Sequence, residues 1–193
     1  MSDFRVRAVR SGTDAGHVRL ELTGEERCAY TLYRRHYAAL GSPVVGDALG
    51  AEAMDAIQSY ARYYRTRELA LGILARGDNS RLGLLRKLKA KGCPEELSRE
   101  ICQSLLEAGY LREEDGAYRM AVLAGKKGWG MRKVHAYLVS RGFSGSLARD
   151  AISRAVESGD VDFDKNRRAF IATRQRRGQT DTQIRAALWR AGF

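Results

Sequence analysis

The hexapeptide LWRAGF, Leu188–Phe193, is the third copy of a pattern that recurs every fifty residues, after LKAKGC (Leu88–Cys93) and LVSRGF (Leu138–Phe143). Each copy indicates the last turn of a helix. A glycine just past that turn accepts the left-handed conformation that closes a Schellman ending, and the residue after it packs back on the leucine. A pattern that returns at a fixed period predicts stacked copies of one structural unit.

Each copy of the unit is expected to contain three helices. One turn before each leucine stands an apolar residue, which gives a pair on one helix face: Leu84, Val134 and Ile184. The expected N-cap positions are Ser80, Gly130 and Thr180, the last in a capping box with Gln183. The predicted helices are 62–76, 81–91 and 95–108, then 115–127, 131–141 and 145–158, then 164–177 and 181–191. The third copy lacks its last helix.

The first sixty residues follow another period. Apolar and polar residues alternate over 4–8 and 18–22, on either side of the stretch SGTDAG at 11–16, which predicts a β-hairpin. The stretch SPVVGD (42–47) is expected to add a short strand, and a helix is expected to begin near Ala51.

The predicted fold class is therefore mainly α. Tandem three-helix repeats would form an elongated curved array after a small β-rich N-terminal element, with about eight helices in all. The predicted parts are the N-terminal element with its lead-in helix at 1–59, repeat one at 60–111, repeat two at 112–161, and an incomplete repeat three of two helices at 162–193.

The net charge of +11 is concentrated in the predicted repeats. Residues 1–59 carry 7 basic and 8 acidic side chains, residues 60–111 carry 10 and 6, and residues 112–193 carry 17 and 9. A positive field of this kind favours polyanions or acidic protein surfaces, although charge also serves solubility alone.

Motifs of catalysis and of metal binding are not found. DVDFD (Asp160–Asp164) begins like a calcium loop, but Lys165 and Ile171 occupy the positions that need Gly and Glu. GKKGWG (Gly125–Gly130) lacks the phosphate-loop pattern. No histidine stands at zinc-ligand spacing from one of the three cysteines. We therefore expect a protein that is not an enzyme and has no metal or cofactor. The odd cysteine count and the lack of a long apolar run predict a cytoplasmic protein in a reducing environment.

Basic side chains are the better candidates for a working surface. A stack of repeats would place them at regular intervals, as in surfaces that follow a polymer, whereas the plainer interpretation is a solvated charged face. The candidate residues are Arg86, Lys87, Lys89, Lys91, Lys126, Lys127, Arg132, Lys133, Arg141, Arg174, Arg176, Arg177 and Trp189. The predicted helix 95–108 exposes mostly Glu and Gln, so it is unsuited to enter a major groove, and any DNA binding is expected to be electrostatic and nonspecific in sequence.

Trp189 has two interpretations. An aromatic side chain among arginines is typical of an anchor in a protein interface. A tryptophan packed inside the third repeat is equally compatible with the sequence, because tryptophan is highly buried on average.

The order of these motifs resembles the RecX family of bacterial recombinase regulators. The resemblance covers about residues 60–193 and rests on SRLGLLRKLKAKG, LLEAGYL and GWGMRKVHAYLVSRGF. The family's G-[YW]-G…I…L…[RK]-G-[IF] pattern is matched by Gly128, Trp129, Gly130, Val134, Leu138, Arg141, Gly142 and Phe143.

The resemblance implies a monomeric modulator that lies in the groove of the RecA–DNA filament, contacts single- and double-stranded DNA, and inhibits ATP hydrolysis, recombination and the SOS response. Two alternatives stay open on the residues alone: a nucleic-acid-binding protein that uses charge only, and a helical adaptor for an acidic protein.

Overall fold

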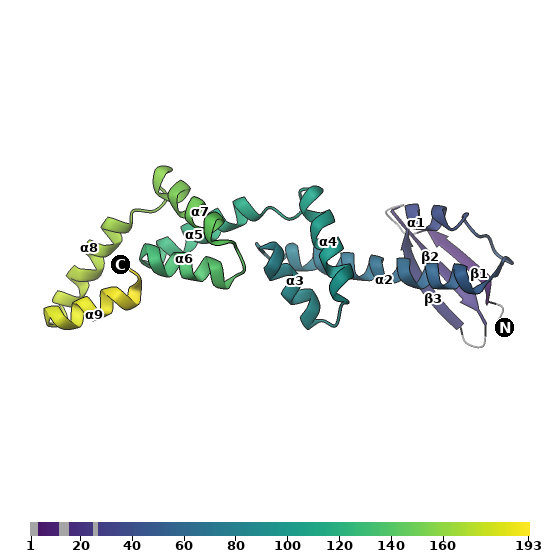
Figure 1. Ribbon diagram of the computed structural model, residues 1–193, viewed down its shortest axis with the longest axis horizontal. Coiled ribbons are helices and arrows are strands. Elements are labelled where there is room, and N and C mark those ends of the chain that lie inside the picture. The colour runs from purple at the N-terminus through teal and green to yellow at the C-terminus, as the bar shows by residue number, and fades with distance from the viewer. Residues whose placement is uncertain (1–3, 12–15, 25–26) are drawn as a thin grey trace. The chain divides into compact units, whose positions relative to one another are not determined.

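The computed structural model describes residues 4–11, 16–24 and 27–193, which form two compact units. The first ends at Leu71 and the second runs from Gly72 to Phe193. Figure 1 shows a sheet with helices in the first unit and helices only in the second. The mainly helical fold with a small N-terminal β element is therefore confirmed.

The N-terminal unit contains a four-stranded antiparallel sheet in the order β3-β2-β1-β4. Its strands are β1 (Phe4–Ser11), β2 (His17–Thr23), β3 (Arg27–Tyr33) and β4 (Ala48–Leu49). Strands β1 and β2 form the predicted hairpin, with Val6 opposite Leu22 and a bulge between Val6 and Ala8. The turn residues 12–15 lie outside the described part of the chain. The inward residues of β1 and β2 form a core with Leu49, Met54 and Ile57.

The prediction of a strand over 42–47 is wrong. Val44 and Val45 are 61% and 63% exposed, so this stretch has no apolar face to bury, and Gly46 turns the chain at a φ of 100°. The strand lies just after it, as β4. Strand β3 and the short helix α1 (Arg34–Ala39) were not predicted.

Helix α2 (Ala51–Leu74) is continuous over 24 residues. It combines the helix expected to begin near Ala51 with the one expected at 62–76. Because proline is absent from this stretch and glycine does not occur before Gly72, nothing in the sequence interrupts the helix.

The helical unit contains seven further helices within its described residues, at the predicted places. They are α3 (Arg81–Ala90), α4 (Glu95–Glu107), α5 (Glu113–Lys126), α6 (Met131–Ser140), α7 (Gly145–Glu157), α8 (Phe163–Gln175) and α9 (Asp181–Ala191). The N-caps at Ser80, Gly130 and Thr180 are confirmed, and so is the capping box of Thr180 with Gln183. The finer repeat boundaries at 60, 112 and 162 stay predictions.

The three glycines of the repeated hexapeptide end helices α3, α6 and α9 as predicted. Gly92, Gly142 and Gly192 have φ values of 79°, 93° and 86°. In each copy the residue after the glycine donates its backbone N–H to the carbonyl of the leucine, at 3.1, 3.2 and 3.0 Å. This is the long-range bond of the Schellman ending. The repeated hexapeptide is therefore a helix terminator.

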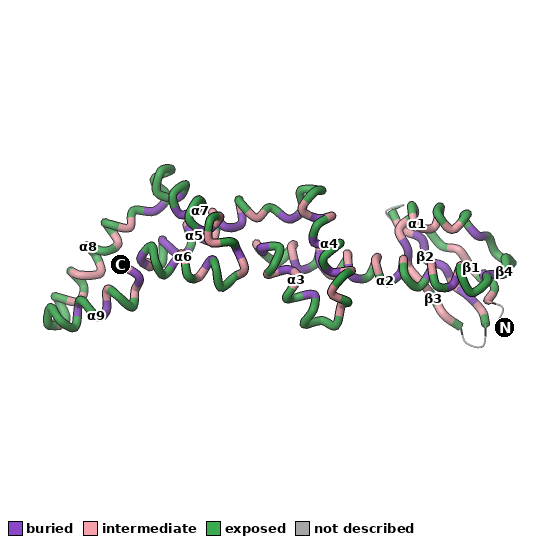
Figure 2. The backbone as a smooth tube through the Cα atoms, in the orientation of Figure 1, coloured by how far each residue is buried: buried purple, intermediate pink, exposed green. Residues whose placement is uncertain are grey.

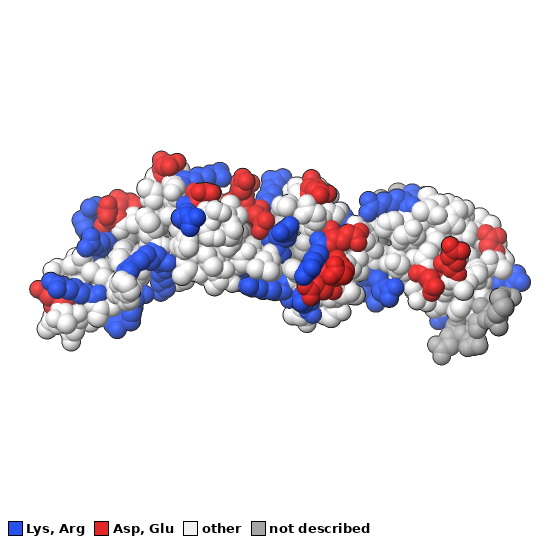
Figure 3. Space-filling model, viewed as in Figure 1, with Lys and Arg blue, Asp and Glu red and all other residues white. Residues whose placement is uncertain are grey.

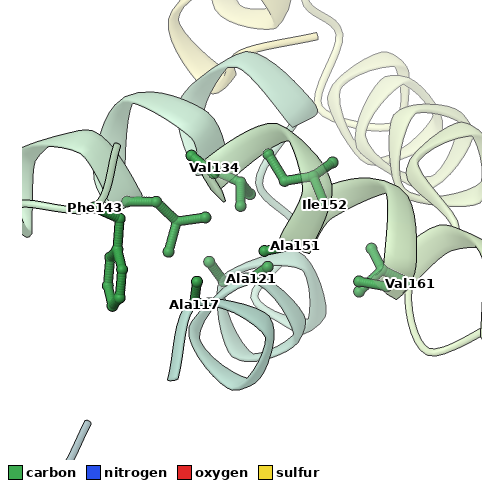
Figure 4. Close-up of a cluster of buried hydrophobic side chains, with 11 residues drawn as sticks. Ala117, Ala121, Val134, Phe143, Ala151, Ile152 and Val161 are labelled. Atoms are coloured by element: carbon green, nitrogen blue, oxygen red, sulfur yellow. The ribbon is translucent and has the colours of Figure 1, made fainter. Parts of the chain in front are cut away.

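The core of the middle repeat is built from small side chains that let helices approach closely. Ala117 and Ala121 of α5 point toward Val134 of α6 and Ala151 of α7 (Figure 4). Figure 2 shows the buried residues as short stretches on the inward faces of the helices, with exposed residues between them. Because alanine buries little area, the stability of this unit depends on the repeat of many such contacts.

Candidate partner-binding surface on the helical repeats

Helices α3 and α6 meet end to end. The Ser80 hydroxyl, at the N-terminus of α3, donates a 2.8 Å hydrogen bond to the carbonyl of Arg141 at the C-terminus of α6. A Cβ on Gly83 would lie 2.8 Å from that carbonyl oxygen, so the contact requires glycine there. A helix N-terminus carries partial positive charge and a C-terminus partial negative charge, which makes this contact electrostatically favourable.

Helices α6 and α9 repeat the arrangement one period later. The backbone N–H groups of Gly130 and Arg132 donate to the carbonyls of Ala191 and Gly192, at 2.8 and 3.1 Å. The Arg132 guanidinium also donates to the carbonyl of Phe193. Free N–H groups at one helix start thus satisfy free carbonyls at another helix end. The hexapeptide both ends a helix and joins it to the repeat before.

The first of these junctions gathers three of the predicted cations. Arg86 Nη1 donates to the Ser140 carbonyl at 3.4 Å, and Lys87 Nζ donates to Asn79 at 2.5 Å. A recess of about 190 Å³ is lined by Arg86, Lys87 and Arg141 among other residues. The pKa of Lys87 is lowered by desolvation and by the charge of Arg141. An anion bound here would relieve that repulsion.

The second junction gathers cations and aromatic rings. Lys127 and Lys133 lie over the ring of Trp129, with Nζ atoms 6.0 and 4.4 Å from its centroid. The Arg132 guanidinium lies 4.0 Å from the centroid of Trp189, which is 71% exposed. The interpretation of Trp189 as a residue packed inside the repeat is therefore wrong, because its ring lies on the surface under an arginine of the neighbouring repeat.

The cations near the end of α8 have a smaller aromatic platform. The Arg174 guanidinium lies 4.3 Å from the centroid of Phe170, whose ring is 5.6 Å from that of Phe193. Arg176 and Arg177 follow at the helix end and are exposed. This group continues the basic surface onto the third repeat.

The remaining predicted cations are not brought to these junctions. Lys89 is paired with Glu95 at 2.5 Å, and Lys126 lies 3.9 Å from Asp160. Lys91 is exposed at the end of α3. Figure 3 shows lysine and arginine side chains spread over the visible face of the helical unit, with acidic side chains among them. The positive surface is therefore interrupted and strongest at the helix junctions.

Two grooves of similar size lie beside the junctions and are related by the fifty-residue period. One, of about 540 Å³, lies between α3 and α4, and the other, of about 520 Å³, between α6 and α7. Six of the seven residues that line the first have a counterpart fifty residues on in the second: Arg81, Leu82, Leu85, Arg99, Cys102 and Gln103 correspond to Met131, Arg132, His135, Arg149, Ile152 and Ser153. The repeat thus presents a similar recess twice, with different chemistry in each copy.

The described residues do not indicate a reactive thiol at Cys102 or a metal site. Burial raises the pKa of Cys102 to about 11, so this thiol stays protonated at neutral pH and is a poor nucleophile. Among the described residues, no group of three His, Cys, Asp or Glu side chains lies close enough to hold a metal ion. Within the same residues, no helix has the length and apolar character needed to cross a membrane.

A cluster of tyrosine and arginine side chains on α2 is not among the residues predicted from the sequence. Tyr60, Tyr63, Tyr64 and Arg67 have the spacing i, i+3, i+4, i+7 and share one face of α2. The signal was present as the run YARYYRTR, in which tyrosine and arginine interleave. Aliphatic periodicity does not reveal this cluster, because none of its members is aliphatic.

Comparison with known proteins finds similar sequences that share one name. A segment of 114 residues is 33% identical to "Regulatory protein RecX" of Stenotrophomonas maltophilia (strain R551-3), and 97 residues are 31% identical to "Regulatory protein RecX" of Ectopseudomonas mendocina (strain ymp). These segments cover 59% and 50% of this chain, and 66% and 62% of the relatives, just under two-thirds of their length. No family model matches the chain.

Solved structures share the fold. "Crystal structure of regulatory protein RecX" matches 98% of this chain and 94% of its own, with a TM-score of 0.76 and 15% identity. "Crystal structure of RecX from Lactobacillus salivarius" matches 68% and 88%, with a TM-score of 0.59 and 15% identity. The sequence relatives and the shared fold agree with the order of motifs in the repeats, and the resemblance of the chain to the RecX family of regulatory proteins is confirmed.

Proposed function

We propose that this protein is a non-catalytic regulator that binds the RecA–DNA filament and lowers its ATPase, recombinase and SOS-inducing activities. Similarity to the RecX regulatory proteins supports the recombinase as the partner. The protein acts in the cytoplasm, where the filament forms, and as a monomer.

The observation that carries the proposal is the repeated junction of helix ends. At both junctions the start of one helix donates to carbonyls at the end of another, through the Ser80 hydroxyl to Arg141 and through the Arg132 N–H to Gly192, and exposed cations stand at both. A filament is itself a repeated structure, so a ligand with repeated contacts binds it more tightly than a single contact would allow.

DNA contributes to this binding through charge. The cations of the junctions lie at exposed positions, and the rings of Trp129 and Trp189 are covered by them. Phosphate contacts of this kind do not depend on base sequence. The recombinase surface and the DNA backbone are thus contacted together.

A sedimentation experiment tests the proposal. Purified protein is mixed with RecA of the same organism and spun with and without single-stranded DNA and a non-hydrolysable ATP analogue. The protein should enter the pellet with the filament at a much lower concentration than with DNA alone. Equal binding to DNA with and without RecA would show a charge-only DNA-binding protein instead. Binding to neither RecA nor DNA would contradict the proposal and favour a helical adaptor for an acidic protein.

A further inference from the structure

The N-terminal unit has a tyrosine-rich surface that the repeats do not explain. Two stretches supply it, YRRHY (Tyr33–Tyr37) and YARYYRTR (Tyr60–Arg67). Together they hold five of the nine tyrosines of the chain. The first stretch spans the end of β3 and the start of α1, and the second lies in α2.

The rings of the two stretches contact one another. Tyr33 lies 4.9 Å from Tyr64 and 6.3 Å from Tyr63, both at steep interplanar angles. His36 is stacked on Tyr60, with centroids 4.5 Å apart and planes within 14°. Each of these side chains is only partly buried. The aromatic cluster is therefore a surface feature that keeps part of its area open to solvent.

Two arginines lie against the same rings. The Arg35 and Arg67 guanidinium carbons lie 5.8 and 5.3 Å from the centroid of Tyr33. Arg35 donates to the Tyr63 hydroxyl at 3.3 Å, and Arg67 donates to the Tyr33 hydroxyl at 3.1 Å. A recess of about 240 Å³ opens between Gly16, Tyr33, Arg35 and Arg67. A guanidinium has five N–H groups, so Arg35 keeps donors for a further acceptor.

The composition of the surface favours an anionic partner with flat rings. The stretches 33–37 and 60–68 contain five arginines and one acidic residue, Glu68. They contain no Leu, Ile, Val, Met or Phe, and Ala61 is buried, so they lack the aliphatic anchors of an apolar protein interface. Arginine with tyrosine is the combination that holds phosphates and stacks on bases in single-stranded nucleic acids.

We propose that this tyrosine–arginine face (Tyr33, Arg35, Tyr60, Tyr63 and Arg67) is a binding site for single-stranded nucleic acid. Unpaired bases stack on the open tyrosine rings, and Arg35 and Arg67 bind the phosphates. A duplex hides its base faces inside the stack, so it gains only the phosphate contacts. The site goes beyond the proposed filament binding, because it lies in the other unit and needs no recombinase.

The test measures oligonucleotide affinity of the full-length protein without RecA. Fluorescence anisotropy of labelled oligothymidylate is compared with that of a labelled duplex for wild type, Tyr63→Leu and Arg35→Ala. Both substitutions should weaken single-strand binding by roughly tenfold. Tyr63→Leu should leave duplex binding unchanged. Arg10→Ala is the matched control, since Arg10 is an exposed cation of the same unit on β1. Thermal unfolding confirms that the variants are folded.

A cross-linking measurement locates the contact directly. Oligothymidylate carrying 5-iododeoxyuridine is irradiated with the protein, and the joined peptides are identified by mass spectrometry. Adducts should appear on peptides that contain Tyr33 or Tyr60–Tyr64. Adducts confined to residues 72–193, or an equal effect of Arg10→Ala and Arg35→Ala, would overturn the proposal. So would a Tyr63→Leu protein that binds oligothymidylate normally but has lost binding to the filament, because the face would then contact protein.

Discussion

Ser80 Oγ makes two hydrogen bonds of 2.8 Å that join helices 61 residues apart in the chain: it accepts from the Gly83 N–H and donates to the Arg141 carbonyl. The side chain is fully buried. One hydroxyl therefore caps α3 and fixes the end of α6 against it, so local helix formation and repeat stacking depend on the same atom.

Replacing Ser80 by alanine should lower the free energy of unfolding by about 2 kcal/mol, because an N-cap is lost and a buried carbonyl loses its donor. Ser144→Ala is the matched control. Ser144 caps α7 in the same way, by accepting from the Leu147 N–H, but its other hydrogen bond is with Ser146 of the same helix. Its loss should cost about 1 kcal/mol. Denaturant unfolding of both variants gives the comparison, and equal costs would contradict a role of Ser80 in stacking.

Gly192→Ala should loosen the last repeat. The φ of 86° already disfavours alanine, and its Cβ would overlap the backbone of Lys133. Gly92 stands at the same place in the first repeat, with a φ of 79° and no atom within 4 Å of a Cβ, so Gly92→Ala carries only the backbone cost of about 1–2 kcal/mol.

Amide hydrogen exchange separates these two effects. The Arg132 N–H, which is bonded to the Gly192 carbonyl, should exchange faster in Gly192→Ala and at the wild-type rate in Gly92→Ala. Unchanged protection of Arg132 in both variants would mean that the junction does not depend on the close approach of glycine.

Much of this junction could be foreseen from the sequence, and part of it could not. The need for glycine at positions 92, 142 and 192 is local, because the left-handed conformation is set by the residue itself. Where the terminated helix then docks is decided by contacts with residues such as Ser80 and Gly130, which lie about sixty residues away. The hexapeptide alone does not contain that information.

The N-terminal unit is harder to predict from its sequence, for a related reason. Strand β3 has the period-two signal, since Cys28, Tyr30 and Leu32 share a face, but cysteine and tyrosine weaken it. Helix α1 has six residues and no buried side chain, so its apolar pattern is absent. The run YARYYRTR indicates the part of the tyrosine–arginine face that lies on α2, but the complete face forms only when β3, α1 and α2 come together.

DNA binding by the helical unit should depend steeply on salt. Lys133→Ala removes an exposed cation beside Trp129. If Lys133 contacts a phosphate, the slope of log affinity against log salt should become shallower by about 0.9 for duplex and about 0.7 for single strands. Lys165→Ala is the control, since Lys165 is an exposed cation of α8 away from the junctions. Affinity that does not change with salt would rule out electrostatic binding, and equal slopes for Lys133→Ala and wild type would remove Lys133 from the contact surface.

The N-terminal unit should lose stability in mild acid. Burial, and next the charge of Arg35, lower the pKa of His36 below its ordinary value of 6.5. The folded state therefore favours neutral His36, stacked on Tyr60 and close to Tyr33 and Tyr63. Its contribution is present above about pH 6.5 and is lost as the pH falls through the lowered pKa, because the unfolded chain takes up the proton first.

His36→Phe keeps an aromatic ring at this position and removes the titration. Thermal unfolding of wild type between about pH 7.5 and about pH 5 should show a larger fall in Tm than that of the variant. His17 and His135 are unchanged in both proteins and cancel in the difference. Identical pH profiles would show that His36 titrates alike in the folded and unfolded states.

Trp189 should matter to the partner and little to the fold. Because its ring is 71% exposed, Trp189→Ala should change the free energy of unfolding by less than about 1 kcal/mol. As an interface anchor beside Arg132, it should contribute roughly 2 kcal/mol or more to filament binding, which corresponds to about 30-fold in affinity. A large loss of Tm would contradict the surface placement.

The most direct test is the ATPase activity of RecA on single-stranded DNA, titrated with this protein and with Trp189→Ala. The proposed function predicts that the wild-type protein lowers the rate of ATP hydrolysis. It should do so at concentrations well below the RecA concentration that is needed to cover the DNA. The variant should need about 30-fold more protein for the same effect. A RecA ATPase rate that stays constant, or rises, as the wild-type protein is added would contradict the account of this chain as an inhibitor of the filament.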